Sequence, residues 1–334
     1  MYSYPDASSL VRALRPDEPI TLLRPHAATR AARFFVEKFP GKSLYAVKAN
    51  PSPALLETLW AAGITHYDVA SLGEVRLVHK FLPDAKLCFM HPVKSERAIA
   101  QAYHNHGVRT VSLDSHEELE KIVRATTSEG VAATDLELCV RIRVSSDHAK
   151  LSLAAKFGAE PSEVADLLIA TRQVADSLGI AFHVGSQAMT PLAYAEAMEK
   201  VRAAIVEASV TVDIVDVGGG FPVFPPDEPT PGPDRFAREL PELLAALPDD
   251  RRPTRLAIEP AHRGPPALGL VEGVARVHLH EPGPRLPVDG RLRQRDGVDV
   301  LDVASRDRLR VDQRRVEDGR AVAQHLGHHA VVAA

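Results

Sequence analysis

Short apolar runs typical of β-strands alternate with helix-like segments over most of this 334-residue chain. The helix-like segments carry apolar residues at helical spacing, and several begin at Ser or Pro, which indicates N-terminal caps. Such alternation predicts right-handed βαβ units and a parallel sheet. Eight strands favour an α/β fold of the closed (β/α)8 TIM-like barrel type, with an open doubly wound sheet as the alternative. The expected strands cover residues 44–48, 66–70, 86–90, 110–114, 137–144, 180–184, 212–217 and 255–259.

Seven helices are expected between these strands, and one more precedes them. The intervening helices cover residues 53–62, 71–81, 95–106, 115–126, 161–178, 191–208 and 235–247, and the preceding helix covers 26–39. A proline-rich loop at 225–233 separates the seventh strand from its helix.

The composition indicates a soluble protein whose partners are small molecules. The net charge is −4, and there is no basic stripe, so we expect no nucleic acid and no membrane surface as a partner. The N-terminus lacks a signal-peptide pattern and no run of 18 apolar residues occurs, which favours the cytoplasm. Cys88 and Cys139 show no Cys-x-x-Cys or Cys/His spacing, so neither a disulfide nor a metal site is expected.

Polar residues fall at the C-terminal end of the expected strands, where barrel enzymes carry their chemistry. One such residue would mean little, but a set at the same end of successive strands indicates a site. In chain order they are Lys48, Asp68, Ser71, His91, Asp114, Ser115, Arg141, His183, Ser186, Gly218, Gly219, Gly220 and Glu259.

Lys48 is the candidate nucleophile of this set. It follows the apolar run 44–47 and precedes a Pro-Ser-Pro turn. Desolvation lowers the pKa of a lysine and frees the lone pair that attacks a carbonyl cofactor. The alternative is a strand-end lysine whose amine reaches out to water.

Three further features complete a cofactor pattern. Gly218, Gly219 and Gly220 let backbone N–H groups converge on a phosphate, although a tight bend is the alternative. His183 offers a flat ring to stack on a planar cofactor, or is an ordinary core histidine. Glu259 would keep a pyridine nitrogen protonated, or form a barrel salt bridge. With Lys48, these features indicate pyridoxal phosphate.

Residues 20–260 resemble the barrel domain of the ornithine/lysine/arginine/diaminopimelate decarboxylase family, pyridoxal enzymes of the alanine-racemase-like fold type III. The matching segments are YAVKAN at 45–50, DVAS at 68–71, HPVK at 91–94, LDS at 113–115, VRI at 140–142, AKFG at 155–158, HVGS at 183–186, GGGFP at 218–222 and IEP at 258–260.

The resemblance implies a role for each matching residue. It implies Lys48 as the lysine that binds the cofactor covalently, His183 on the ring and Glu259 on the pyridine nitrogen, with these three as catalytic residues. It also implies Ser186 and the glycines Gly218, Gly219 and Gly220 on the phosphate. Asp68, Glu74 and Arg141 match polar positions that line the same pocket.

The implied activity is decarboxylation of a basic amino acid. HPVK followed by GVRTVSLDS is more similar to ornithine or lysine decarboxylases than to diaminopimelate decarboxylases. The products would be putrescine from ornithine or cadaverine from lysine, as in polyamine biosynthesis. Glu259 favours decarboxylation, because alanine racemases usually carry an arginine at the pyridine nitrogen. A non-catalytic cofactor-binding barrel and an amino acid racemase are the alternatives.

The segment after the expected barrel differs in kind, so we expect a barrel over 20–262 and an aberrant, poorly ordered tail over 263–334. From Gly264 onward the sequence has no Phe, Tyr, Trp, Ile, Met, Lys, Asn, Thr or Cys. Apart from Ser305, every residue there can be encoded by a codon that begins with G or C, which suggests a frameshift near Ala261. A genuine low-complexity extension is the alternative.

The tail also departs from the pattern of the family. The family carries an EPGR motif where this chain reads EPAHR at 259–263. Its β-domain supplies a Cys-Asp-Gly segment, which reaches the partner's active site across a homodimer, and a late tyrosine; the tail has no cysteine and no tyrosine. These departures put the activity of the chain, and the expected homodimer, in question.

Overall fold

The computed structural model describes residues 2–18, 20–39, 41–144, 149–151 and 156–222, together with strands at 255–258, 274–277, 293–295, 298–300 and 329–332. The chain divides into two compact units, formed by residues 1–27 with 272–334 and by residues 28–271. No helix within the described ranges is long and apolar enough to span a bilayer.

In the described part of residues 28–271, eight parallel strands close a barrel in the order β11-β12-β3-β4-β5-β6-β7-β9. The predicted (β/α)8 fold is therefore confirmed. The barrel strands are β3 (Lys42–Ala46), β4 (His66–Asp68), β5 (Lys86–Phe89), β6 (Thr110–Leu113), β7 (Glu137–Arg141), β9 (Ser177–Ala181), β11 (Ile214–Asp216) and β12 (Arg255–Ile258).

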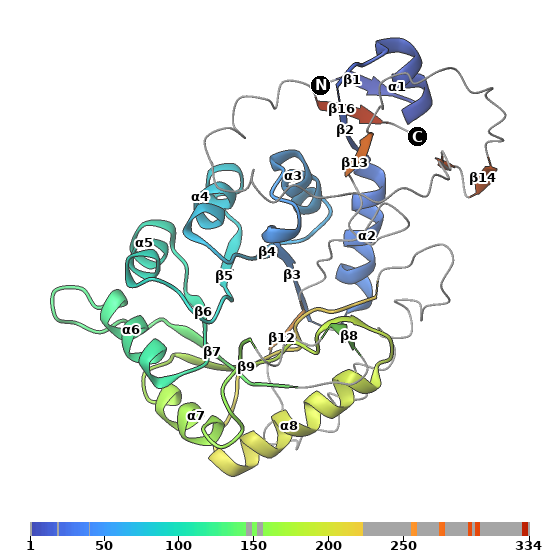
Figure 1. Ribbon diagram of the computed structural model, residues 1–334. Helices are drawn as coiled ribbons and strands as arrows, with labels where there is room; N and C mark the ends of the chain where they lie inside the picture. Colours follow the sequence, from blue (N-terminus) through green and yellow to red (C-terminus); the bar gives the residue numbers. More distant parts are fainter. Residues whose placement is uncertain are drawn as a thin grey trace. The chain divides into compact units, whose positions relative to one another are not determined.

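Helices flank the strands on the outer side of the barrel (Figure 1). Three of them begin at a serine whose side chain accepts a hydrogen bond from the backbone N–H three residues further on, as an N-cap does: Ser71, Ser95 and Ser115. The helices are α2 (Pro25–Lys38), α3 (Pro53–Ala61), α4 (Leu72–Phe81), α5 (Glu96–His106), α6 (His116–Thr126), α7 (Val164–Arg172) and α8 (Leu192–Ala208).

The boundary between α7 and β9 differs from the prediction. A helix to residue 178 and a strand from 180 were expected, but α7 ends at Arg172 and β9 begins at Ser177. Leu178 is fully buried and pairs with Leu138 of β7. Pairing within the sheet therefore decided a segment whose apolar residues suit either element. The helix expected at 235–247 and the loop at 225–233 lie outside the described residues.

Small and medium-sized apolar side chains from the barrel strands form a buried cluster. Both cysteines are free, and they lie in this cluster as core residues. Its members are Leu44, Cys88, Met90, Cys139, Ala181 and Ile214. A packed core of this kind leaves the strand ends as the place for polar chemistry.

The other unit contains a four-stranded sheet in the order β1-β16-β2-β13. Strand β16 runs parallel to β1 and β2, whereas β13 is antiparallel to β2. The described apolar cluster of this unit comprises Leu10 and Leu22, with Tyr4, Ala7, Val11 and Ile20 against it, all from the first 23 residues. The elements are β1 (Tyr2–Tyr4), α1 (Ala7–Leu14), β2 (Ile20–Leu23), β13 (Val274–Val277) and β16 (His329–Val332).

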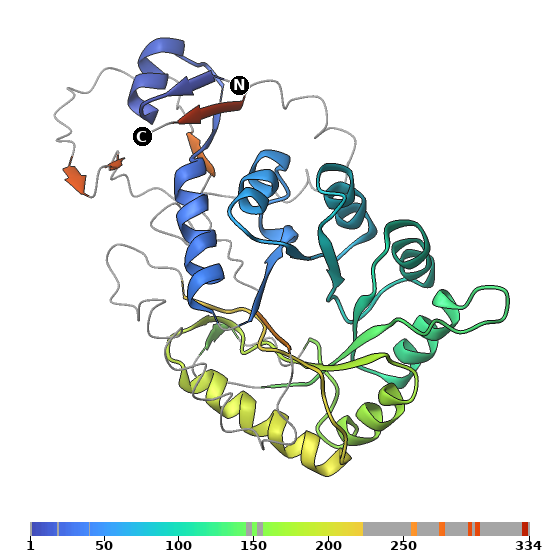
Figure 2. The same ribbon diagram turned by 180° about the vertical axis from the view of Figure 1, so that it is seen from behind.

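Two smaller two-stranded sheets complete the described elements. Strands β8 (Ala149–Leu151) and β10 (Ser186–Ala188) are antiparallel partners, as are β14 (Arg293–Arg295) and β15 (Val298–Val300). Strands β13, β14, β15 and β16 fall within residues 263–334, the segment expected as an aberrant tail. The rest of that segment lies outside the described residues. Figure 2 shows the barrel strands and their helices from behind.

Candidate active site

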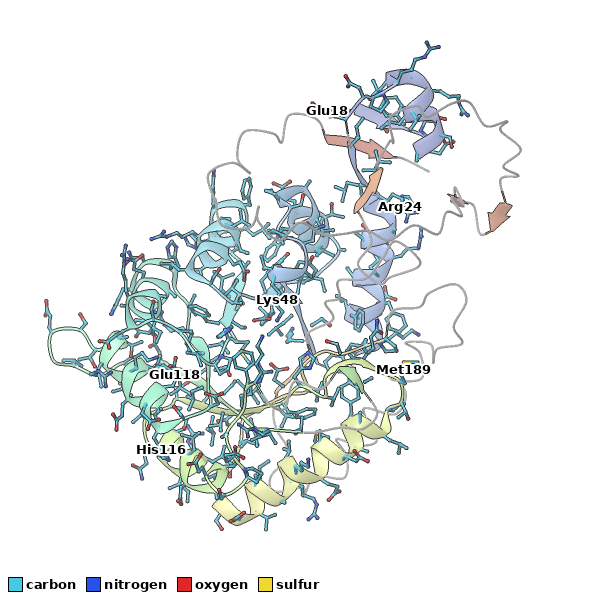
Figure 3. The ribbon with its side chains drawn as sticks, in the orientation of Figure 1. Glu18, Arg24, Lys48, His116, Glu118 and Met189 are labelled. Carbon is cyan, nitrogen blue, oxygen red and sulfur yellow. The ribbon has the colours of Figure 1, made fainter. Side chains whose placement is uncertain are left out.

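Lys48 lies just beyond the C-terminal end of β3, in the short 3-10 helix η1 (Val47–Ala49). Its side chain, labelled in Figure 3, is 52% exposed, and its Nζ atom donates a hydrogen bond of 3.1 Å to Oδ2 of Asp68. Asp68 ends the neighbouring strand β4, and its side chain is buried. The amine is therefore accessible to a small molecule while a buried carboxylate contacts it from the barrel.

A second buried carboxylate, Asp216, lies at the end of β11. Burial raises the pKa of Asp216 to about 6, and the Asp68 carboxylate raises it as well. A hydrogen bond from Gly218 N–H and the charges of Arg141 and Lys48 act in the opposite direction. Asp68 itself keeps one buried oxygen, Oδ1, with no hydrogen-bond partner in the described part of the chain. The site thus concentrates negative charge beside Lys48.

His183 lies two residues after β9 and is partly buried. Its Nδ1 atom accepts a hydrogen bond of 3.0 Å from Gly185 N–H, so the neutral ring carries its proton on Nε2. Burial lowers the pKa of His183 to about 3, assisted by the positive charges of Arg141 and Lys48. The imidazole is therefore neutral near pH 7, and it can present a flat, uncharged face.

Arg141 and His91 share an aromatic neighbour at the carboxyl edge of β5 and β7. The Arg141 guanidinium lies 5.3 Å from the ring centroid of Phe157, a cation–π distance. The His91 ring meets the same Phe157 edge-on at 5.1 Å. Asp114 fixes this segment, because its Oδ2 accepts a hydrogen bond of 2.9 Å from Gly158 N–H. Phe157 and Gly158 together thus contact the expected site residues of three strands.

A buried lysine holds the loop that carries His91. The amine of Lys94 donates hydrogen bonds to the carbonyls of His91 at 2.8 Å and of Ser112 at 2.5 Å. It also lies 3.0 Å from Oε1 of Glu118, which is buried on α6 (Figure 3). Burial lowers the pKa of Lys94 to about 8, while Glu118 opposes this shift. The loop is therefore attached to both a strand and a helix.

The glycine run follows β11 and packs closely against the segment after β9. Gly218 and Gly220 have φ angles of +66° and +101°, a region that favours glycine. A Cβ atom at Gly218 would overlap the carbonyl oxygen of Phe182, and one at Gly220 that of Gly185. Part of the requirement for glycine is therefore a close approach of two backbone segments. From the sequence alone, a tight bend was the alternative to a phosphate cradle.

The remaining expected residues are less central in the described geometry. Ser186 begins β10 and is partly buried. Glu74 caps a helix, because its Oε2 accepts a hydrogen bond of 2.6 Å from Ala70 N–H near the start of α4. Ser71 caps the same helix. Glu259 lies outside the described residues, so its role stays a prediction.

The described residues fit a phosphate-bearing aldehyde cofactor. Gly219 and Gly220 are buried, and within the described chain neither of their N–H groups has a hydrogen-bond acceptor. Buried donors without acceptors are costly, so an anion that accepts from them is stabilised there. Lys48 supplies an accessible amine, and Lys48 and Arg141 supply positive charge. Among the described residues, no group of three or more His, Cys, Asp or Glu side chains could hold a metal ion.

Three contributors to this site were not predicted from the sequence. Asp216 was taken as part of an apolar strand, although an acid two residues before a glycine run was a usable signal. Phe157 was noted only within the AKFG segment. Tyr194, whose hydroxyl donates a hydrogen bond of 2.8 Å to Gly219 O, lies 25 residues before its partner, and no sequence pattern connects the two.

These features define a class of protein: a (β/α)8 barrel that binds an anionic aldehyde cofactor at its carboxyl edge. The sequence model of the family described as "Pyridoxal-dependent decarboxylase, pyridoxal binding domain" matches residues 26–262, well over half of the chain. The chain belongs to this family, which confirms the resemblance, and its cofactor is pyridoxal phosphate.

Two curated relatives with decarboxylase names match part of this chain. The chain is 37% identical over 184 residues to lysine/ornithine decarboxylase of Selenomonas ruminantium, which covers 54% of this chain and 44% of that one. It is 33% identical over 183 residues to ornithine decarboxylase of Mus musculus, covering 53% and 38%. The chain therefore spans less than half the length of these relatives.

Solved structures support the same fold. Lysine/ornithine decarboxylase from Vibrio vulnificus, complexed with putrescine, has a TM-score of 0.62 at 28% identity, with 77% of this chain and 68% of that chain covered. The arginine decarboxylase of Paramecium bursaria Chlorella virus, bound to agmatine, has a TM-score of 0.65 at 25% identity, with 76% and 67% covered.

Proposed function

We propose that this chain decarboxylates a basic amino acid with pyridoxal phosphate, forming putrescine from ornithine or cadaverine from lysine. The observation that carries the proposal is the Lys48–Asp68 pair, an accessible amine 3.1 Å from a buried carboxylate. The names of the relatives support a basic amino acid as the substrate.

The described residues can perform distinct parts of such a reaction. When bound, the cofactor supplies an aldehyde that takes up an amine and a ring that accepts the electron pair left by departing CO2. Asp68 accepts a hydrogen bond from Lys48 Nζ, so it is placed to hold a proton taken from that amine. Lys48 can move a proton at its Nζ atom. His183 offers a neutral ring face that adds no positive charge.

We propose Lys48, His183 and Glu259 as the catalytic residues. Lys48 would provide the covalent attachment, His183 would pack on the ring and Glu259 would contact the pyridine nitrogen. The proposed cofactor-binding residues are Lys48, Asp68, Arg141, His183, Ser186, Gly218, Gly219, Gly220 and Glu259.

The wider organisation is also proposed. The cofactor-binding barrel was expected over residues 20–262, but β2 (Ile20–Leu23) pairs in the sheet of the other unit, so we propose that the barrel comprises the later residues of this range. We also propose that residues 263–334 replace the family's β-domain, with a shifted reading frame as the cause. Sequencing the gene across the codons for residues 260–264 tests the frame directly. We also propose a homodimer, a cytoplasmic location and a role in polyamine synthesis.

A non-catalytic cofactor-binding barrel is the second candidate. One relative of the same family, 31% identical over 186 residues, is named antizyme inhibitor 2 of Homo sapiens rather than a decarboxylase. The EPAHR segment at 259–263 also departs from the family motif. An amino acid racemase is a third candidate, which would change optical purity without releasing CO2.

The test is CO2 release from ornithine and from lysine by the purified chain with pyridoxal phosphate. Lys48→Ala should abolish both CO2 release and the visible absorbance of the covalently bound cofactor. Lys42→Ala is the matched control, because Lys42 is exposed at the opposite end of the same strand. Cofactor absorbance without CO2 release would refute decarboxylation and favour the non-catalytic barrel.

A further inference from the structure

Three hydrogen bonds hold the glycine run in place. The Oδ1 atom of Asp216 accepts from Gly218 N–H at 2.9 Å. The Tyr194 hydroxyl donates to Gly219 O at 2.8 Å, and this bond is buried. Gly220 O accepts from the N–H of Ala188, in β10, at 2.8 Å. Each glycine therefore has one backbone group fixed by a residue outside the run.

These bonds determine where the remaining N–H groups point. In a trans peptide the C=O and the following N–H point in opposite directions, and the described residues contain no cis peptide. Because Tyr194 holds Gly219 O on the side of α8, the N–H of Gly220 must point to the opposite side. Asp216 holds the run at its start by fixing Gly218 N–H. The N–H groups of Gly219 and Gly220 accordingly find no acceptor in the described chain.

Tyr194 is suited to this task by its surroundings. It lies in the first turn of α8, and its side chain is fully buried. Its ring stacks on Phe221, with centroids 5.6 Å apart and planes at 25°. Phe221 in turn meets Phe35 of α2 edge-on at 5.6 Å. Burial raises the pKa of Tyr194, so its hydroxyl remains a donor at all ordinary pH values.

We propose that Tyr194 and Asp216 are positioning residues that aim the backbone N–H groups of Gly219 and Gly220 at the phosphate of the cofactor. Neither side chain needs to touch the cofactor, because each acts through the orientation of a glycine peptide. This inference rests on the proposed function for the identity of the bound phosphate, but its test measures binding rather than turnover.

The experiment compares pyridoxal phosphate with pyridoxal, which lacks the phosphate. Dissociation constants are measured for the full-length chain and for Tyr194→Phe, which keeps the ring stacking and removes the hydroxyl. We expect Tyr194→Phe to weaken pyridoxal phosphate binding about fivefold, equal to about 1 kcal/mol, the usual net contribution of one hydrogen bond. Pyridoxal binding should change less than about twofold. Equal losses for the two ligands, or no loss for either, would overturn the proposal.

Matched variants keep the test decisive. Tyr103→Phe removes a tyrosine hydroxyl that bonds to the exposed Asp135, and it should change neither constant. Asp216→Asn keeps an oxygen that accepts from Gly218 N–H and should retain the preference for pyridoxal phosphate, whereas Asp216→Ala should lose it. If Tyr194→Phe does not fold, the Asp216 pair decides the question in the same assay.

The outcome is separable from that of the proposed function. A chain that releases no CO2 but loses phosphate preference in Tyr194→Phe would refute decarboxylation and leave this inference standing. A chain that releases CO2 normally, and whose Tyr194→Phe variant binds both ligands as tightly as before, would support decarboxylation and refute this inference.

Discussion

Replacing Asp216 by Asn should stabilise the barrel unit in a pH-dependent manner. The carboxyl of Asp216 is buried, and its pKa is raised from 3.8 to about 6, mainly by burial. Between these two values the folded state holds a proton that the unfolded state has released, so ionisation of Asp216 costs stability as the pH rises. An asparagine never ionises, and its side-chain oxygen can still accept from Gly218 N–H.

The magnitude follows from the size of the shift. One pKa unit corresponds to about 1.4 kcal/mol, so a shift from 3.8 to about 6 amounts to about 3 kcal/mol once the group is fully ionised. Part of this is already present at pH 4. The difference in unfolding free energy between Asp216→Asn and the parent chain should therefore grow by about 2 kcal/mol between pH 4 and pH 7.

The assay is urea unfolding without added cofactor, followed by the fluorescence of Trp60, the only tryptophan of the sequence, which lies on α3 in the barrel unit. The exposed Asp84 provides the control, because Asp84→Asn should give a difference within about 0.5 kcal/mol at every pH. A difference for Asp216→Asn that is constant from pH 4 to pH 7 would refute the argument from burial.

Three further changes test other parts of the structure. Lys94→Ala should lower the unfolding free energy by about 3 kcal/mol in urea titrations, because it removes the buried cation of a buried ion pair and leaves Glu118 with the partly exposed Lys121. Gly158→Ala should cost more than about 1 kcal/mol in the same assay, since φ is +102° and the new Cβ would lie 2.6 Å from Arg143 N. For His183, whose pKa falls from 6.5 to about 3 on folding, the unfolded state takes up a proton first as the pH drops. Stability should therefore fall below about pH 6.5, and His183→Gln should make that fall shallower between pH 6.5 and pH 4.

Each of these changes has a matched comparison. Lys121 also contacts Glu118 but is partly exposed, so Lys121→Ala should cost at most about 1 kcal/mol; an equal loss for both lysines would contradict the burial argument. Gly107 has φ of +67° with nothing within 4 Å of a new Cβ, so Gly107→Ala should cost less than Gly158→Ala. If the stability of His183→Gln falls as steeply as that of the parent chain between pH 6.5 and pH 4, the pKa of His183 does not differ between the folded and unfolded states as argued.

The barrel was predictable because its strands are buried on both faces. Apolar runs such as 44–47 and 138–140 stand out from the amphipathic helices between them, and their alternation leaves few topologies. The end of α7 was not predictable in the same way. By composition residues 177–178 suit a helix or a strand, and only the pairing of β9 with β7 places them in a strand.

The site was predictable where it follows the strand ends. Lys48, Asp68, Arg141 and His183 all lie at or just beyond the end of a barrel strand, which a single architectural rule identifies. Tyr194 follows no such rule. Its contribution is a side-chain hydrogen bond from a helix to a loop carbonyl, and such a contact depends on packing in three dimensions rather than on spacing along the chain.

Asp216 connects the two ends of the candidate site. Its Oδ1 atom fixes the start of the glycine run, so it acts on the proposed phosphate side. The positive charge of Lys48 lowers the pKa of Asp216, while Asp68, the hydrogen-bond partner of Lys48, raises it. Loss of the charge on Lys48 therefore favours protonation of Asp216. The charge on Lys48 and the protonation state of Asp216, at the base of the glycine run, are consequently coupled.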